Sequence, residues 1–142
     1  MAKRKANAEW KGTLPDGKGT LELGSGAFKG SYSFQSRFED GSGTNPEELI
    51  AAAHAGCFYM ALSGALGKNG YKPESVKTEA TVSLVKDDQG FKISKIDLVC
   101  DAHVPGIDEE AFAGFAEGAK KNCPVSKVLS GAVINLTAHL KN

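Results

Sequence analysis

The chain has 142 residues, enough for one domain with its own core and short for two. Lys and Arg together number 17, as do Asp and Glu, so the formal net charge is zero. Nucleic acid and anionic membranes need clustered positive charge. We therefore predict a single domain, residues 1–142, that binds neither. Only two of the basic residues are arginines, Arg4 and Arg37.

The first residues carry a charged head with no apolar run behind it, which is not the pattern of a secretory signal. We therefore expect a cytoplasmic protein. Cytosolic thiols are kept reduced, which disfavours a structural disulfide and still admits a transient, catalytic one. The three cysteines also cannot all pair within one chain.

Short strands are predicted over residues 6–11 and 19–23, joined by a turn at Pro15-Asp16-Gly17. Aromatic and polar residues alternate over 32–38, which predicts a strand with Arg37 on the face away from the aromatic side chains. Strands 76–85 and 91–100 flank a turn that ends at Gly90 and form a second hairpin. A last strand is expected over 132–140.

A long helix is predicted to begin after Asn45, with Asn45 as N-cap, Pro46 at the first helical position and Glu48 as the capping-box partner. It should end near residues 67–70, where glycine can adopt the left-handed cap. Residues 49–66 carry no Asp, Glu, Lys or Arg. Their many alanines, with His54 among them, make a weak membrane span, so we expect a helix surrounded by protein.

Two more helices are predicted, over 107–121 and over 124–129, the second opened by Pro124. Strands and helices are grouped and do not strictly alternate. The pattern therefore predicts an α+β fold with a mainly antiparallel sheet. The glycine-rich stretches 24–26 and 41–43 lack the features of phosphate or dinucleotide loops and are interpreted as turns.

Cys57 lies in the long helix after Ala55 and Gly56, whose small side chains leave room for another molecule to approach. An unpaired cysteine usually behaves as a small buried hydrophobe. Glu47, on the same helix, stands ten residues earlier, about 15 Å along the axis. It can serve Cys57 only through an intermediate such as Arg37, or across a subunit boundary. Glu48 is explained as a cap, so Glu47 is the better functional candidate.

Cys123 immediately precedes Pro124 and is therefore expected to be the N-cap of the last short helix. Unpaired backbone N–H groups and the positive end of a helix lower the pKa of a thiol. Local chemistry therefore names Cys123 as the nucleophile at least as readily as Cys57. Spacing alone leaves the order of the two thiols open.

Two other groupings of residues suggest different chemistry. His54 stands one turn before Cys57, which could form a Cys–His catalytic pair, although a packed, hydrogen-bonded histidine suits this alanine-rich helix better. Cys100 and His103 could suggest zinc, but no further ligands stand at the required spacing. We therefore predict no metal and no cofactor.

Several motifs together resemble the OsmC/Ohr organic hydroperoxide reductases, in the OsmC branch. The resemblance covers nearly the whole chain, and the two cysteine motifs in this order are specific. The matching segments are Ser36-Arg37-Phe38-Glu39, Thr44-Asn45-Pro46-Glu47-Glu48-Leu49-Ile50, His54-Ala55-Gly56-Cys57-Phe58, Val104-Pro105-Gly106-Ile107-Asp108 and Cys123-Pro124-Val125-Ser126.

This resemblance implies an intertwined homodimer whose sheets wrap around the central helix, with sites formed by both subunits. It implies that Cys57 attacks the peroxide, that Cys123 resolves the product, and that Arg37 with Glu47 holds the thiolate and orients the peroxide. In the Ohr branch the arginine comes from the early glycine-rich loop. Residues 12–19 contain none, so the role of Arg37 follows from the OsmC placement. The implied reductant is a lipoyl-type dithiol, such as a lipoylated protein.

The resulting hypothesis is a thiol peroxidase that reduces organic hydroperoxides, and more weakly hydrogen peroxide, through a Cys57 sulfenic acid and a Cys57–Cys123 disulfide. Two rival classes stay open at this point. One is a hydrolase or acyl-transfer enzyme using Cys57 and His54. The other is a non-catalytic thiol sensor or binding domain.

Overall fold

The structure is a computed structural model that describes all of residues 1–142. The chain forms two compact units, residues 1–49 and residues 50–142. The prediction that both belong to one domain stays a prediction.

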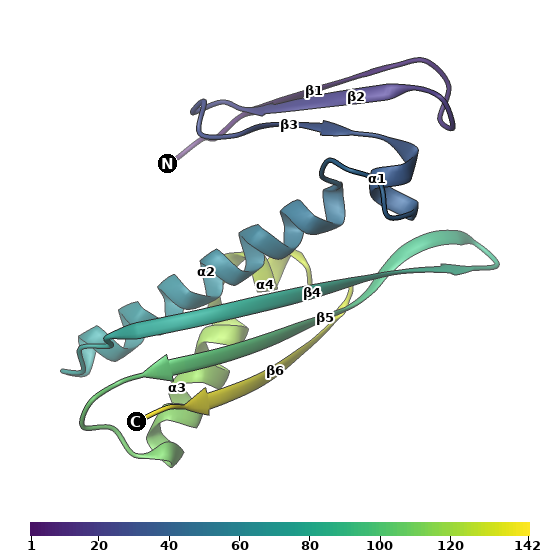
Figure 1. Ribbon diagram of the computed structural model, residues 1–142. Helices are drawn as coiled ribbons and strands as arrows, with labels where there is room; N and C mark the ends of the chain where they lie inside the picture. Colours follow the sequence, from purple (N-terminus) through teal and green to yellow (C-terminus); the bar gives the residue numbers. More distant parts are fainter. The chain divides into compact units, whose positions relative to one another are not determined.

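The first unit contains a three-stranded antiparallel sheet in the order β1-β2-β3 (Figure 1). Its strands are β1 (Ala6–Lys11), β2 (Lys18–Leu23) and β3 (Lys29–Tyr32). The predicted hairpin between the first two strands is confirmed, and its turn is closed by the Gly17 amide, which donates to the Thr13 carbonyl at 2.7 Å. Leu21 of β2 is buried, whereas every residue of β1 is exposed.

The strand predicted over residues 32–38 is wrong, because β3 ends at Tyr32 and a short helix, α1 (Phe34–Phe38), follows. Ser33 caps this helix in a reciprocal box: its hydroxyl accepts the Ser36 amide, and the Ser36 hydroxyl accepts the Ser33 amide, each at 2.9 Å. Phe34 and Phe38 lie four residues apart with ring centroids 5.0 Å apart, as helical neighbours do. The aromatic spacing fitted a strand and a helix alike, and the cap decides between them.

The predicted start and end of the long helix are confirmed in α2 (Pro46–Lys68). The Asn45 side-chain oxygen accepts the Glu48 amide at 2.7 Å, as an N-cap does. The Glu48 carboxylate accepts the Thr44 hydroxyl at 2.7 Å, which replaces the predicted capping-box bond to the backbone. Gly70 follows the helix with φ +86°, and the Tyr71 amide donates to the Leu66 carbonyl at 3.0 Å.

The second unit holds a sheet in the order β4-β5-β6, formed by β4 (Ser75–Asp87), β5 (Gly90–His103) and β6 (Val133–Leu140). The β4–β5 hairpin is antiparallel, as predicted, and its strands are longer than expected. The β5–β6 pair is parallel, because the chain crosses back through α3 (Glu109–Asn122) and α4 (Pro124–Val128). The α+β class with mainly antiparallel pairing is therefore confirmed.

The core of the second unit lies between α2, the sheet and α3, which are drawn in Figure 1. Its fully buried side chains include Phe58, Leu62 and Leu66 of α2 and Ile96 of β5. These residues make α2 a core helix. By length and composition alone it would also suffice to cross a membrane, although no membrane-spanning role follows from that.

Candidate active site

The second unit brings Cys57 of α2 and Cys123 together. Their sulfur atoms lie 2.6 Å apart, and both cysteines are free. A disulfide needs a sulfur separation of about 2.05 Å. The two thiols can therefore bond with little movement of the backbone.

Cys123 joins two helices. Its amide closes α3 by donating to the Ala119 carbonyl at 3.0 Å. Its sulfur caps α4 and accepts the Ser126 amide at 3.5 Å, with Pro124 as the first helical residue. The predicted N-cap position is confirmed. Cys123 is fully buried, whereas Cys57 is partly exposed.

The environments of the two thiols shift their pKa values in opposite directions. Burial raises the pKa of Cys57, the hydrogen bond with Cys123 adds to this, and a backbone hydrogen bond from Val125 opposes it. Burial also acts to raise the pKa of Cys123, but hydrogen bonds from Cys57 and from the Ser126 amide and hydroxyl outweigh it, so the pKa of Cys123 is lowered. Within this unit, negative charge is held better on Cys123.

The hydrolase hypothesis requires a hydrogen bond between His54 and Cys57, but His54 bonds to a different residue. Its Nε2 lies 2.7 Å from the Ser126 hydroxyl oxygen, and its side chain is fully buried. Burial lowers the pKa of His54, so the ring is neutral at pH 7. The interpretation of His54 as a packed, hydrogen-bonded residue is therefore confirmed.

Ser126 is the site residue that sequence reasoning missed. It is buried and touches both His54 and Cys123. Its position in Cys-Pro-Val-Ser, three residues after the cap, is where a capping contact forms. That spacing was the available signal, but the contact to His54 joins residues 72 positions apart in the sequence.

Arg37 and Glu47 belong to the first unit and form a tight ion pair there. Arg37 Nη2 lies 2.8 Å from Glu47 Oε1, and Nε lies 3.2 Å and 3.3 Å from the two carboxylate oxygens. Such forked contacts fix the guanidinium geometry. The Glu47 side chain is 10% exposed and that of Arg37 39%. The expected contact between these residues is therefore present, and the guanidinium keeps an accessible edge.

An aromatic cavity of about 130 Å³ lies beside this ion pair, within the first unit. Burial raises the pKa of Tyr32 in its wall, while the charge of Arg37 opposes that rise. The cavity could accept a small apolar group next to a positive charge. Its lining residues are Trp10, Leu14, Tyr32, Ser33, Phe34, Arg37, Phe38 and Pro46.

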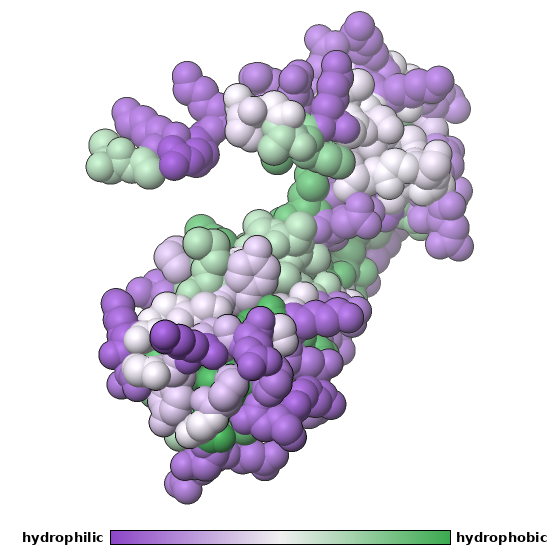
Figure 2. Space-filling model, turned by 60° about the vertical axis from the view of Figure 1, so that its left-hand side comes forward, coloured by the Kyte–Doolittle hydropathy of each residue, from purple (hydrophilic) through white to green (hydrophobic).

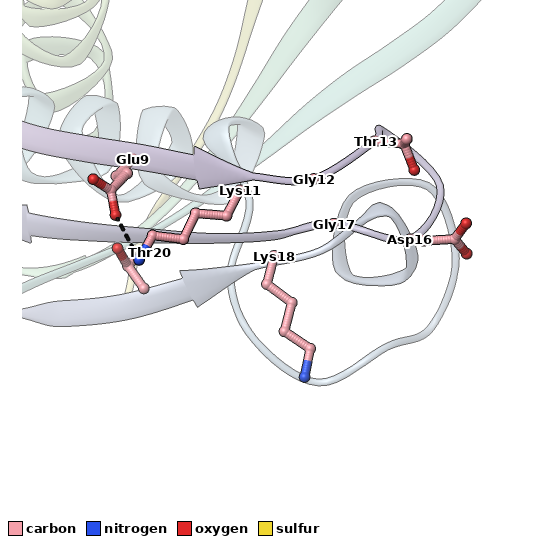
Figure 3. A pocket seen from close by; sticks show the side chains of 8 residues that line it. All are labelled: Glu9, Lys11, Gly12, Thr13, Asp16, Gly17, Lys18 and Thr20. Carbon is pink, nitrogen blue, oxygen red and sulfur yellow. Dashed lines mark ion pairs between the residues drawn. The ribbon is translucent and has the colours of Figure 1, made fainter.

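A second hollow, of about 630 Å³, lies on the β1–β2 hairpin. Figure 3 shows its polar side chains dispersed, with Asp16 and Lys18 pointing in different directions and Lys11 paired with Glu9. It is lined by no thiol, histidine or arginine. We assign it no chemistry.

Cys100 and His103 do not form a zinc site together. Cys100 is fully buried in β5, and burial raises the pKa of its thiol. His103 instead places Nδ1 2.8 Å from the Glu74 carboxylate. Burial in the core accounts for Cys100, and the contact with Glu74 accounts for His103.

An α+β fold with two free thiols within bonding range, one of them capping a helix, defines a two-cysteine thiol protein. The sequence profile of the OsmC family, described as OsmC-like protein, matches residues 39–137. The chain is 51% identical over 140 residues to the peroxiredoxin OsmC of Escherichia coli (strain K12), covering 98% of this chain and 97% of that relative. The chain belongs to the OsmC family, in its OsmC branch.

Solved structures agree with this assignment. The organic hydroperoxide resistance protein OhrB of Bacillus subtilis is 27% identical, with a TM-score of 0.75 over 95% of this chain and 98% of that one. An organic hydroperoxide resistance protein OsmC from Legionella pneumophila is 25% identical, with a TM-score of 0.74 over 99% and 100% of the two chains.

Proposed function

We propose that this protein is a cysteine-based peroxidase that reduces organic hydroperoxides to alcohols. The 51% identity with a peroxiredoxin OsmC over nearly the full chain supports this. The observation that carries the chemistry is the 2.6 Å approach of the Cys57 and Cys123 sulfurs. A thiol that is oxidised by a peroxide needs a second thiol within reach to avoid overoxidation.

In this proposal Cys57 attacks the peroxide and Cys123 resolves the product. The Cys57 thiolate takes the terminal oxygen of the hydroperoxide, so the O–O bond breaks and an alkoxide leaves and becomes the alcohol. The Cys123 sulfur then displaces that oxygen as water and forms the disulfide. Exposure favours this order, because the peroxide can reach partly exposed Cys57, whereas buried Cys123 needs to reach only Cys57.

We assign Arg37 and Glu47 to the stabilisation of the attacking thiolate. A nearby guanidinium lowers the pKa of a thiol, and the pKa of Cys57 is raised by its own surroundings. The attacking thiol therefore needs an added positive charge. The forked ion pair with Glu47 would hold Arg37 in a defined orientation, and the aromatic cavity beside it suits the apolar part of an organic peroxide.

The cycle closes when an external dithiol reduces the disulfide. One thiolate of the dithiol attacks the Cys57 sulfur and releases Cys123, and its second thiol then displaces Cys57. The family resemblance favours a lipoyl-type reductant. A cytoplasmic location, predicted from the sequence, is one in which such reductants keep thiols reduced.

We also propose that the protein acts as an intertwined homodimer. Helix α2 is strongly apolar, yet only 22% of its most hydrophobic window is buried. Large hydrophobic side chains are exposed on both units; they include Trp10, Phe28, Tyr59, Met60 and Val133. Figure 2 shows green, hydrophobic areas at the surface. A second chain would remove this surface from water. Sedimentation should give twice the 14.9 kDa chain mass, whereas a monomer at micromolar concentration would contradict the dimer.

The function is tested by mass spectrometry after one equivalent of an alkyl hydroperoxide is added to reduced protein. We expect a Cys57–Cys123 disulfide, one equivalent of alcohol, and reversal by a dithiol. Cys57→Ser should abolish turnover. Cys123→Ser should complete one turnover and then accumulate Cys57 sulfinic acid. Cys100→Ala, which removes the third thiol, is the matched control and should keep turnover.

The same experiment separates the rival classes. A sensor would form the disulfide once but would not turn over with excess dithiol and peroxide. A hydrolase would release product from an activated ester and would lose that activity with His54→Ala. Peroxide turnover at the wild-type rate in Cys57→Ser would refute the proposed order.

A further inference from the structure

The peroxidase chemistry proposed above uses two thiols and an ion pair, and it leaves a buried histidine and a buried serine unexplained. His54 is fully buried and Ser126 is 5% exposed. Their side chains lie 2.7 Å apart, and the Ser126 backbone amide donates to the Cys123 sulfur at 3.5 Å. Ser126 therefore links the buried histidine to the residue that carries a reacting sulfur.

The direction of the hydrogen bonds follows from counting partners. His54 Nδ1 is buried and has no hydrogen-bond partner. If Nδ1 carried the proton, a buried N–H would be left unpaired, and the Ser126 hydroxyl would have to donate its only hydrogen bond to Nε2. If Nε2 carries the proton, it donates to the Ser126 oxygen, which leaves the Ser126 proton free for Cys123. The second arrangement satisfies more groups, and it makes the Ser126 hydroxyl a donor that lowers the pKa of Cys123.

We propose that His54 is a positioning residue that acts through the Ser126 hydroxyl to hold the Cys123 sulfur as a thiolate. This inference rests on the proposed peroxidase cycle. The thiolate is the nucleophile that forms the Cys57–Cys123 disulfide and the leaving group when a dithiol reduces it. His54 itself touches neither the peroxide nor a reacting sulfur.

The chemistry of each step balances. In disulfide formation, the Cys123 thiolate attacks the Cys57 sulfenic acid, the S–O bond breaks, and the hydroxide that leaves takes up a proton to become water. Cys123 is oxidised and the sulfenic sulfur is reduced. In the reverse half of the cycle, the dithiol forms a bond to the Cys57 sulfur, and Cys123 departs as a thiolate that the Ser126 hydroxyl receives as a hydrogen-bond donor.

The first test measures the pKa of Cys123 without any peroxide. The thiolate absorbs in the ultraviolet, and the difference between Cys57→Ser and Cys57→Ser/Cys123→Ser isolates the Cys123 titration. Serine at position 57 keeps a hydroxyl donor beside Cys123. In this background, His54→Asn and Ser126→Ala should each raise the pKa of Cys123 by about one unit, which is a tenfold smaller thiolate fraction below the pKa.

A matched substitution separates the hydrogen bond from packing. The amide nitrogen of Gln lies near the position of histidine Nε2, whereas that of Asn lies near Nδ1. His54→Gln should therefore keep the pKa of Cys123 close to that of the parent. Combining His54→Asn with Ser126→Ala should shift the pKa no further than Ser126→Ala alone, because His54 acts only through Ser126. His139→Asn, at an exposed histidine paired with Asp101, should have no effect.

The second test is kinetic. A thiol whose pKa rises by one unit loses thiolate but gains intrinsic nucleophilicity, so disulfide formation in His54→Asn should slow by about threefold. Sulfenic acid formation at Cys57 should keep its rate. The inference would be overturned if Cys123 had the same pKa with histidine and with asparagine at position 54. It would also be overturned if His54→Gln shifted the pKa of Cys123 as much as His54→Asn does.

The wild-type protein supplies a measurement that does not depend on the stability of a variant. Nitrogen NMR of the reduced protein at neutral pH should show neutral His54 with its proton on Nε2. A proton on Nδ1, or an imidazolium, would overturn the inference. A protein that shows these properties but does not react with hydroperoxide would refute the proposed function and leave the His54–Ser126–Cys123 arrangement established.

Discussion

At the scale of single residues, the positive charge of Arg37 is the contribution that is easiest to isolate. Arg37→Met removes the charge and keeps much of the side-chain volume. If Arg37 stabilises the attacking thiolate, the pKa of Cys57 should rise by about one unit, and this rise alone should slow peroxide reduction at neutral pH by about threefold. The measurement is the pH dependence of Cys57 alkylation in a Cys123→Ser background, together with the turnover rate.

Arg37→Lys is the matched control for that prediction. Lysine keeps the charge but cannot reproduce the forked contacts with Glu47. We expect a turnover rate between those of the wild type and Arg37→Met. The pKa of Cys57 in Arg37→Lys should lie nearer to the wild-type value than the pKa in Arg37→Met does. An unchanged alkylation profile in Arg37→Met would remove Arg37 from the assigned role.

Residue-level prediction succeeded where the cause is local. The cap at Cys123 follows from the proline that comes next, and the cap at Asn45 follows in the same way. The partner of His54 could not be predicted, because the bond to Ser126 joins segments far apart in the sequence. The roles of Cys57 and Cys123 also stay predictions, since helix capping and family resemblance point to different attacking thiols.

At the scale of elements, α1 is the helix that the alternating aromatic residues wrongly predicted as a strand. The Ser36 hydroxyl accepts the Ser33 amide and donates to the Thr44 carbonyl at 2.7 Å. Ser36→Ala leaves that buried carbonyl unpaired. We expect the free energy of unfolding to fall by about 1–3 kcal/mol, measured by chemical denaturation. Peroxide reduction should also slow, because α1 carries Arg37.

Gln35→Ala is the control for that substitution, since Gln35 is an exposed neighbour on the same turn. Its effect on the free energy of unfolding should stay within about 0.5 kcal/mol. Equal stability of Ser36→Ala and Gln35→Ala would show that the capping box does not hold α1. Alternating aromatic residues cannot distinguish this helix from a strand, whereas a serine three residues after another serine can favour a cap.

At the scale of the whole molecule, buried His54 makes stability depend on pH. The pKa of His54 is lowered in the folded chain from its ordinary value of 6.5. The unfolded chain therefore takes up a proton first as the pH falls below about 6.5. As the pH falls below about 6.5, the free energy of unfolding should decrease by up to about 1.4 kcal/mol per pH unit. The contribution of His54 to this pH dependence should stop once the pH is below the pKa of His54 in the folded chain.

His54→Gln supplies the comparison, because glutamine does not titrate. The difference in the free energy of unfolding between the two proteins, followed by denaturation at several pH values, should change between neutral pH and pH 5. A constant difference would mean that the pKa of His54 is the same in the folded and unfolded chains. Protonation of carboxylates contributes equally to both proteins and cancels.

The sequence by itself determined the α+β class, the two hairpins, the long apolar helix with its caps, and the family, because local periodicity, turn chemistry and motif spacing carry these features. Only the tertiary structure decided that Cys57 and Cys123 lie within bonding range, that Arg37 pairs with Glu47 from a helix, and that His54 bonds to Ser126. These contacts join residues that are distant in the sequence or whose secondary structure the local pattern did not predict. Burial and packing bring these residues together, so their distances cannot be inferred from local sequence patterns.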